Sequence, residues 1–163
     1  MKKIIIFIGH GDIPSDFPKE KLKEYFELRN FYKIGLLEEK DRKKFKEIEE
    51  SLKKWERNEN NDRHYFDLKK LSEEIEREIK IKTSFAFNEF CYPDIFEKFE
   101  EVKNEYDEIY FVSTFIFKGK HSDEIKDKIE ELKNNYKDKK IFYISLKEEF
   151  LKEFFIKNIK EFI

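Results

Sequence analysis

The sequence predicts an α/β domain with a mostly parallel four-stranded sheet and helices on both of its faces. Two observations predict this class. Short, continuous apolar runs rich in β-branched and aromatic residues alternate with stretches in which apolar residues recur at a helical period. Strands that alternate with helices form parallel sheets with right-handed crossovers. A length of 163 residues suits one domain with its own core.

The first expected strand is the run from Ile4 to Ile8, which ends at Gly9. Because successive residues are all apolar, this strand should be buried on both faces, as strands of parallel sheets are. Three further strands are expected at 82–87, 108–115 and 140–145. The pattern leaves the order of the strands in the sheet open.

Each of the last three expected strands is followed by a stretch with the period of an amphipathic helix. Apolar side chains share one helical face in each stretch, so three helices should pack against the sheet. The apolar positions are Ile95, Phe99, Val102 and Tyr106; Ile125, Ile129, Leu132 and Tyr136; and Phe150, Phe154, Phe155, Ile159 and Phe162.

The connection between the first two strands is far longer than one crossover helix needs. We therefore expect one domain over 1–163 with a helical insertion at about 19–62. Asp16-Phe17-Pro18 resembles a helix start, with Pro18 at the first helical position. The polar run from Asn58 to Asp62 should end the insertion, and a helix should then lead into the second strand.

Composition restricts the partners and the compartment. Lys and Arg number 35 against 37 Asp and Glu, so the net charge of −2 offers no attraction for nucleic acid or an anionic membrane. The single cysteine, Cys91, cannot form an intramolecular disulfide and suits a reducing compartment. The run from Ile4 to Ile8 is too short for a membrane span or a signal peptide. We expect a soluble, cytoplasmic protein.

Candidate site residues follow three of the expected strands. Ligands of open α/β sheets bind beyond the carboxyl ends of the strands. His10 follows the first strand, Glu89 the second and His121 the third. Two imidazoles and a carboxylate suit a divalent ion such as cobalt, nickel, iron or zinc. One isolated histidine is more often a satisfied polar side chain or a helix cap, but convergence at one edge favours a metal site.

Other polar residues have simpler interpretations. Asp12 is expected to cap a turn, and His64 to lie at the surface or to cap a helix. Cys91 is a candidate soft ligand if exposed near Glu89, whereas a small buried residue is the more common role. The glycines on either side of His10 permit a tight turn, but their spacing fits neither standard phosphate-binding motif.

Three segments resemble the class II tetrapyrrole chelatases, in particular the short sirohydrochlorin cobaltochelatase (CbiX)-like proteins. They are the strand with its His-Gly end at Ile4 to Gly11, the Phe-x-Glu-x-x-x-Pro pattern from Phe87, and the strand end with Gly-x-His and an acidic helix start at Phe115 to Ile125. The resemblance covers the frame of the domain but not the insertion. The sequence departs from the family by carrying Asp12 where serine is common, and Ser113-Thr114 where proline is common.

The resemblance implies a metal chelatase, a lyase that inserts cobalt, nickel or iron into a sirohydrochlorin-like tetrapyrrole in cobalamin or related biosynthesis. It implies no organic cofactor, because the divalent metal is a substrate. His10 would be metal ligand and proton acceptor, His121 the second ligand, and Glu89 a ligand or proton relay. Short members have one domain where longer members have two similar halves, so a homodimer is implied.

Two alternatives remain open at this level. The chain could be a non-catalytic metal or tetrapyrrole binding protein that keeps the pocket without turnover. It could also be a protein-interaction module in which the charged segment from Lys19 to Arg57 binds a partner and the histidines are structural.

Overall fold

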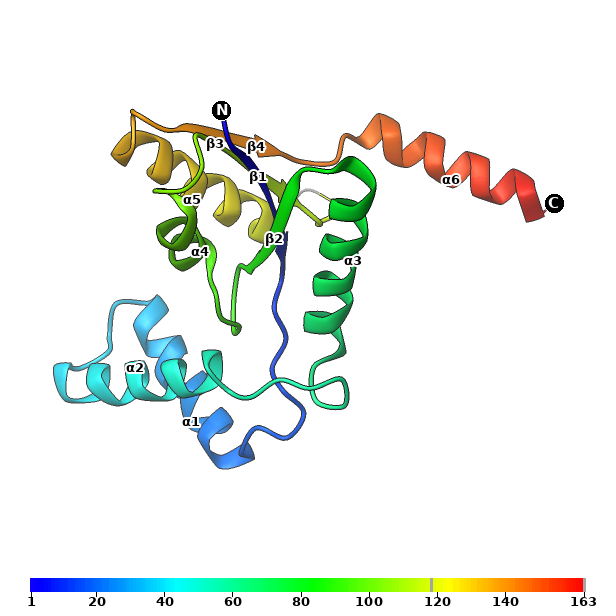
Figure 1. The fold of residues 1–163 in the computed structure, drawn as a ribbon. Coiled ribbons are helices and arrows are strands. Elements are labelled where there is room, and N and C mark those ends of the chain that lie inside the picture. The colour runs from blue at the N-terminus through cyan, green and yellow to red at the C-terminus, as the bar shows by residue number, and fades with distance from the viewer. Residues whose placement is uncertain (118, 163) are drawn as a thin grey trace.

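The computed structural model describes residues 1–117 and 119–162, and within them four strands form one parallel sheet (Figure 1). The strands are β1 (Lys3–Gly9), β2 (Lys82–Phe87), β3 (Glu108–Ser113) and β4 (Lys140–Ile144), in the order β2-β1-β3-β4. The expected α/β class is confirmed. Chain order does not determine this arrangement, which puts β1 in the middle, between β2 and β3.

Helices cover both faces of the sheet. The helices α4 (Ile95–Val102) and α5 (Lys120–Asn135) pack on one face, where they share a core with Ile4, Ile6 and Ile8 of β1. On the other face α3 (Arg63–Ile79) packs against β1 and β2. The first strand is therefore buried on both sides, as its unbroken apolar run predicts.

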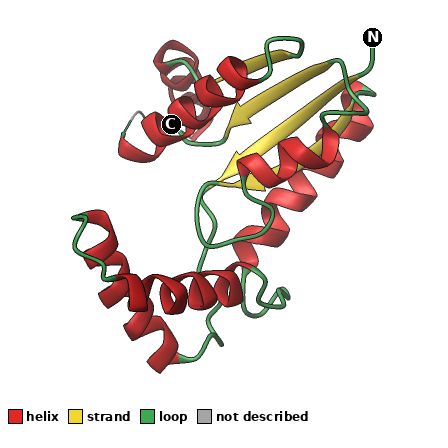
Figure 2. Cartoon of the chain, turned by 90° about the vertical axis from the view of Figure 1, so that its left-hand side faces the viewer, coloured by secondary structure: helices red, strands yellow, loops and turns green. Residues whose placement is uncertain are grey.

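The long connection between β1 and β2 contains two helices before α3. They are α1 (Lys19–Lys33) and α2 (Glu39–Lys53), and they lie beyond the carboxyl ends of the strands rather than on a face of the sheet (Figure 2). The two helices share a small core of their own. Its buried members are Phe17, Tyr25, Leu37, Phe45, Ile48 and Leu52. The description of this segment as an insertion into one domain stays a prediction.

Some element ends differ from the predictions. β3 ends at Ser113 rather than Phe115, and the hydroxyl and amide of the next residue, Thr114, both donate to the Ile8 carbonyl at the sheet edge. α4 ends at Val102, although Tyr106 still packs against the same core. Pro18 is the N-cap of α1, one position before the first helical residue.

The last helix, α6 (Glu148–Phe162), projects away from the body (Figure 1). Its side chains Phe150, Phe154, Phe155 and Ile159 are exposed. The helix forms where the sequence predicts it, but the prediction that its apolar face packs against the sheet of the same chain is wrong. None of the helices in residues 1–117 and 119–162 has the length and apolar character to cross a membrane.

Candidate metal centre

The loops that follow β1 and β2 continue the pairing of the two strands. The amide of Asn88 donates to the Gly9 carbonyl at 2.9 Å, and the amide of Glu89 donates to the His10 carbonyl at 2.8 Å. These two hydrogen bonds bring the first two predicted site residues side by side at the carboxyl edge of the sheet. The parallel register therefore positions both of them.

Gly11 allows this close approach of the two loops. Its φ is +88°, and a Cβ at this position would lie 1.9 Å from the Glu89 carbonyl oxygen. No side chain fits there without moving the main chain that carries Glu89. The glycine after His10 therefore has a steric role in the site.

Replacement of Gly11 by alanine is expected to reduce the free energy of unfolding by at least about 2 kcal/mol, since a positive φ and a main-chain clash act together. Gly35→Ala is the matched control, because Gly35 also has a positive φ, of +72°, but open space around it. It should lose only about 1 kcal/mol. Urea denaturation of both variants measures the difference, and equal losses would contradict the steric role of Gly11.

The imidazole rings of His10 and His121 lie edge to face, with centroids 4.6 Å apart. His10 Nδ1 donates to the Gly11 carbonyl at 2.7 Å, because a carbonyl oxygen only accepts. The lone pair of His10 is then on Nε2, the nitrogen that remains available to a metal ion. The main chain thus sets the tautomer of one predicted ligand.

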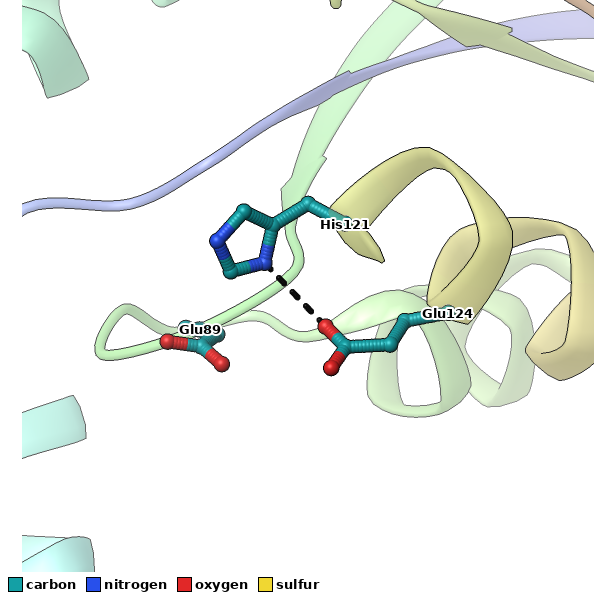
Figure 3. Close-up of side chains that lie close together, drawn as sticks. All are labelled: Glu89, His121 and Glu124. Carbon is teal, nitrogen blue, oxygen red and sulfur yellow. Dashed lines mark hydrogen bonds and ion pairs between the residues drawn. The ribbon is translucent and has the colours of Figure 1, made fainter. Parts of the chain in front are cut away.

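Glu89, His121 and Glu124 form a second part of the same cluster (Figure 3). One potential ligand atom from each residue lies within 4.8 Å of those of the other two. The structure therefore brings His10, Glu89 and His121 together at one edge, as the sequence predicts. Their roles as ligands remain a proposal.

Glu124 is a member of this cluster that the sequence prediction missed. Its Oε2 lies 3.1 Å from His121 Nδ1 and accepts a hydrogen bond from the side-chain amide of Asn88 at 3.2 Å. Burial favours a higher pKa for Glu124, but these hydrogen bonds outweigh it and lower the pKa. A carboxylate on Nδ1 leaves His121 Nε2 free for a metal. The spacing of three residues on a helix was the available signal.

Arg29 of α1 also reaches the cluster, and the sequence prediction missed it too. Its Nη2 lies 2.6 Å from Glu89 Oε1, and the two side chains are only 17% and 16% exposed. The guanidinium lies over the Phe90 ring, 5.1 Å from its centroid. Glu89 is therefore paired with a cation in this structure.

A cavity of about 250 Å³ lies beside this ion pair, between the α1 and α2 helices and the loop after β2. Lys53 and Lys128 line it together with Arg29. Lys53 pairs with Asp94 at 3.0 Å, and Lys128 donates to the side-chain and main-chain oxygens of Asn88. Burial lowers the pKa of Lys128. The wall of the cavity thus carries three cationic side chains, and the carboxylates of Glu49, Glu89 and Asp94 line it as well.

Arg57 joins the α1–α2 segment to the loops of the site. It is buried and paired with Asp62. It also donates to the carbonyls of Leu52 at 3.1 Å, Asp12 at 2.7 Å and Phe90 at 2.7 Å. One guanidinium therefore connects the end of α2 with the loops after β1 and β2.

The remaining candidates lie outside the cluster. His64 is half-buried at the start of α3, and the cap of that helix is Asp62, so a capping role for His64 is wrong. Cys91 is buried, as the simpler interpretation predicts, and burial raises the pKa of its thiol to about 12. A thiol that stays protonated is a poor metal ligand. Asp12 is exposed, and Arg57 binds its carbonyl rather than its carboxylate.

The cluster has the groups that metal delivery and proton removal both need. Two imidazole nitrogens with free lone pairs suit a borderline divalent ion, and a carboxylate offsets its charge. Imidazoles and carboxylates are also the side chains that commonly serve as general bases in enzymes. The cluster is open to solvent on one side, because His121 is 39% exposed.

The model of the protein family described as CbiX matches residues 46–147, more than half of the chain. The matched part contains Glu89, His121 and Glu124 and begins after His10 and Arg29. No curated protein matches the chain.

Proposed function

The chain belongs to the CbiX family, a family of tetrapyrrole metal chelatases, and on this premise we propose that it inserts cobalt, nickel or iron into a sirohydrochlorin-like tetrapyrrole. The observation that carries the proposal is the meeting of His10 and His121 beside Glu89 at the carboxyl edge of the sheet. The reaction would belong to cobalamin or related biosynthesis in the cytoplasm. The metal is a substrate, and no organic cofactor takes part.

The reaction exchanges two protons for one metal ion. Two pyrrole N–H bonds break, metal–nitrogen bonds form, and the bonds between metal and protein are released. We assign His10 Nε2 and His121 Nε2 to hold the metal, with Glu89 as a further ligand or proton relay. His10 then takes one pyrrole proton once its bond to the metal is broken, and Glu89 takes the other as proton relay. Glu124 orients the His121 ring through its hydrogen bond to Nδ1, the nitrogen that does not face the metal in this assignment.

A spectroscopic assay tests the proposal. Purified protein is mixed with cobalt or nickel and sirohydrochlorin, and the absorption spectrum of the pigment is followed against a control without protein. We expect the spectrum of the metal complex to develop faster with protein. Equal rates with and without protein would rule out chelatase activity on this substrate.

The main alternative is binding of a metal or tetrapyrrole without turnover. The ion pair between Arg29 and Glu89 fits binding of a tetrapyrrole without turnover, because it occupies a carboxylate that metal insertion needs. Tight binding without faster insertion would support it. An independent interaction module is less consistent with the contacts, since Arg57 and Arg29 join the α1–α2 segment to the site.

A homodimer is part of the proposal, and α6 supplies the argument for it. On the α3 side of the sheet, β4 leaves Phe142 and Ile144 40% and 47% exposed, while α6 exposes its own apolar side chains. Both surfaces expose large apolar side chains to water, and burial of apolar surface is the main source of association energy. We propose that α6 of each copy covers the β3–β4 face of the other, a reciprocal contact with twofold symmetry.

The double substitution Phe154→Glu/Phe155→Glu is expected to convert the dimer to a monomer, since it places charge in the proposed apolar contact. Size-exclusion chromatography with light scattering measures the mass. Lys152→Glu/Lys157→Glu changes charge on the same helix without removing aromatic side chains and is the control. A monomeric unsubstituted protein, or a double variant that remains dimeric, would contradict the contact.

A further inference from the structure

We propose that Arg29 is an exchange residue: it holds Glu89 in the substrate-free protein and moves to a carboxylate arm of the tetrapyrrole, which releases Glu89 to the metal. This inference rests on the proposed function, because it assumes that a metal and a polycarboxylate tetrapyrrole meet at this site. It assigns a role to a residue of α1, which lies outside the part of the chain that matches the family.

Arg29 and a metal ion compete for the carboxylate of Glu89. A carboxylate oxygen 2.6 Å from a guanidinium is already neutralised, and the pair is mostly shielded from water. A metal ion bound by Glu89 would also lie close to the positive charge of Arg29, and like charges at this distance repel strongly where screening is weak. Metal binding by Glu89 is therefore favoured when Arg29 has another anionic partner.

A small cavity lies next to Arg29. Its volume of about 250 Å³ is below the range of about 300–1,000 Å³ for pockets that hold whole drug-sized ligands. A tetrapyrrole ring does not fit, but an acetate or propionate arm does. Arginine binds carboxylates through paired N–H donors, so an arm in this cavity is a suitable replacement for Glu89.

Arg29 differs from the two lysines of the same cavity in the residue that it pairs with. Lys53 pairs with Asp94, and Lys128 donates to Asn88, so neither is bonded to a predicted metal ligand. A lysine there attracts an anionic arm without affecting the metal directly. Among the cavity cations described, Arg29 is the one whose partner, Glu89, is needed by the metal.

The exchange couples the binding of the two substrates. By linkage, a tetrapyrrole that takes Arg29 from Glu89 strengthens metal binding, and the metal strengthens tetrapyrrole binding by the same factor. Removal of the guanidinium should therefore have opposite effects on the two ligands when each is measured alone. Loss of structure at the site would instead weaken both.

The experiment compares the unsubstituted protein with Arg29→Gln, Arg29→Lys and Lys53→Gln. Cobalt binding without tetrapyrrole is measured by calorimetry. Binding of metal-free uroporphyrin, a polycarboxylate tetrapyrrole, is measured without metal by fluorescence quenching. Arg29→Gln should bind cobalt at least about fivefold more tightly and uroporphyrin at least about fivefold more weakly, the lower end of ordinary coupling factors. Thermal unfolding of each variant verifies that it is folded.

The two control variants have distinct expected results. Arg29→Lys keeps the charge and should fall between the unsubstituted protein and Arg29→Gln for both ligands. Lys53→Gln should weaken uroporphyrin binding and leave cobalt binding unchanged, because Lys53 is not bonded to Glu89.

The outcomes separate the exchange from the proposed function. If the unsubstituted protein binds no cobalt, the proposed metal site is wrong and the exchange falls with it. If it binds cobalt, but folded Arg29→Gln binds cobalt equally or more weakly, the exchange is overturned and the metal site stands. Unchanged uroporphyrin binding by Arg29→Gln likewise overturns the exchange.

Discussion

His10→Ala is expected to lower the rate of metal insertion by about 10²–10⁴-fold, the usual contribution of a positioned acid–base group, without a comparable change in the affinity for the tetrapyrrole. The reason is that the His10 ring lies 4.6 Å from the ring of His121, while its Nδ1 is bonded to the Gly11 carbonyl and leaves Nε2 for the metal. Loss of this imidazole would remove both a proposed metal ligand and a proposed proton acceptor. Insertion of cobalt into sirohydrochlorin, followed by absorption, measures the rate.

His121→Ala should show a loss of the same order, because both rings belong to one cluster. Losses of the two variants should not add in the double variant, since each disables the same site. His64→Asn is the control, since the His64 ring packs next to Gly9 and His64 is not one of the residues grouped in the cluster. If His10→Ala retains the full rate while it is folded, His10 has no role in the reaction.

Arg57→Met is expected to reduce the free energy of unfolding by about 3–5 kcal/mol, a large share of the about 5–15 kcal/mol that holds a typical domain folded. The side chains of Arg57 and Asp62 are 6% and 0% exposed. Removal of the cation leaves the Asp62 carboxylate buried without its charge partner, and it takes one donor from each of three carbonyls. Urea denaturation at neutral pH measures the loss.

Arg63→Met is the matched control for this experiment. Arg63 pairs with Asp67 at 3.5 Å on the surface of α3, where the two side chains are 87% and 66% exposed. Pairs of this kind contribute about 0–1 kcal/mol, so the control should remain almost as stable as the unsubstituted protein. The double variant Arg57→Met/Asp62→Asn should recover part of the loss, because no buried charge remains. A loss for Arg57→Met no larger than that of the control would show that this contact does not hold the loops together.

The frame of the fold could be predicted because its signals are local. An unbroken run of β-branched and aromatic residues such as Ile4 to Ile8 favours a strand covered on both faces, and the helical periods before and after β2 and after β3 supply that cover. His10, Glu89 and His121 could be assigned to one edge for the same reason, because the carboxyl ends of parallel strands share that edge.

The other members of the site have no such local signal. Arg29 and Glu89 are 60 residues apart, and in a chain with 44% charged residues no pattern separates an arginine that enters a site from those in solvent. The role of Arg57 was equally unpredictable from the sequence, since its partners include the carbonyls of two distant loops. An ion pair between distant segments is determined by how α1 and α2 pack, and packing depends on shape as well as on composition.

The sequence by itself thus determined the α/β class, the strands, the apolar faces of the helices and the edge at which His10, Glu89 and His121 meet. The tertiary structure decided the strand order, the pairing of Glu89 with Arg29, the hydrogen bond of Glu124 to His121, and the separation of α6 from its own sheet. The physical reason is range: hydrophobic periodicity is a property of neighbouring residues, whereas ion pairs and helix docking exist only after remote segments have come together.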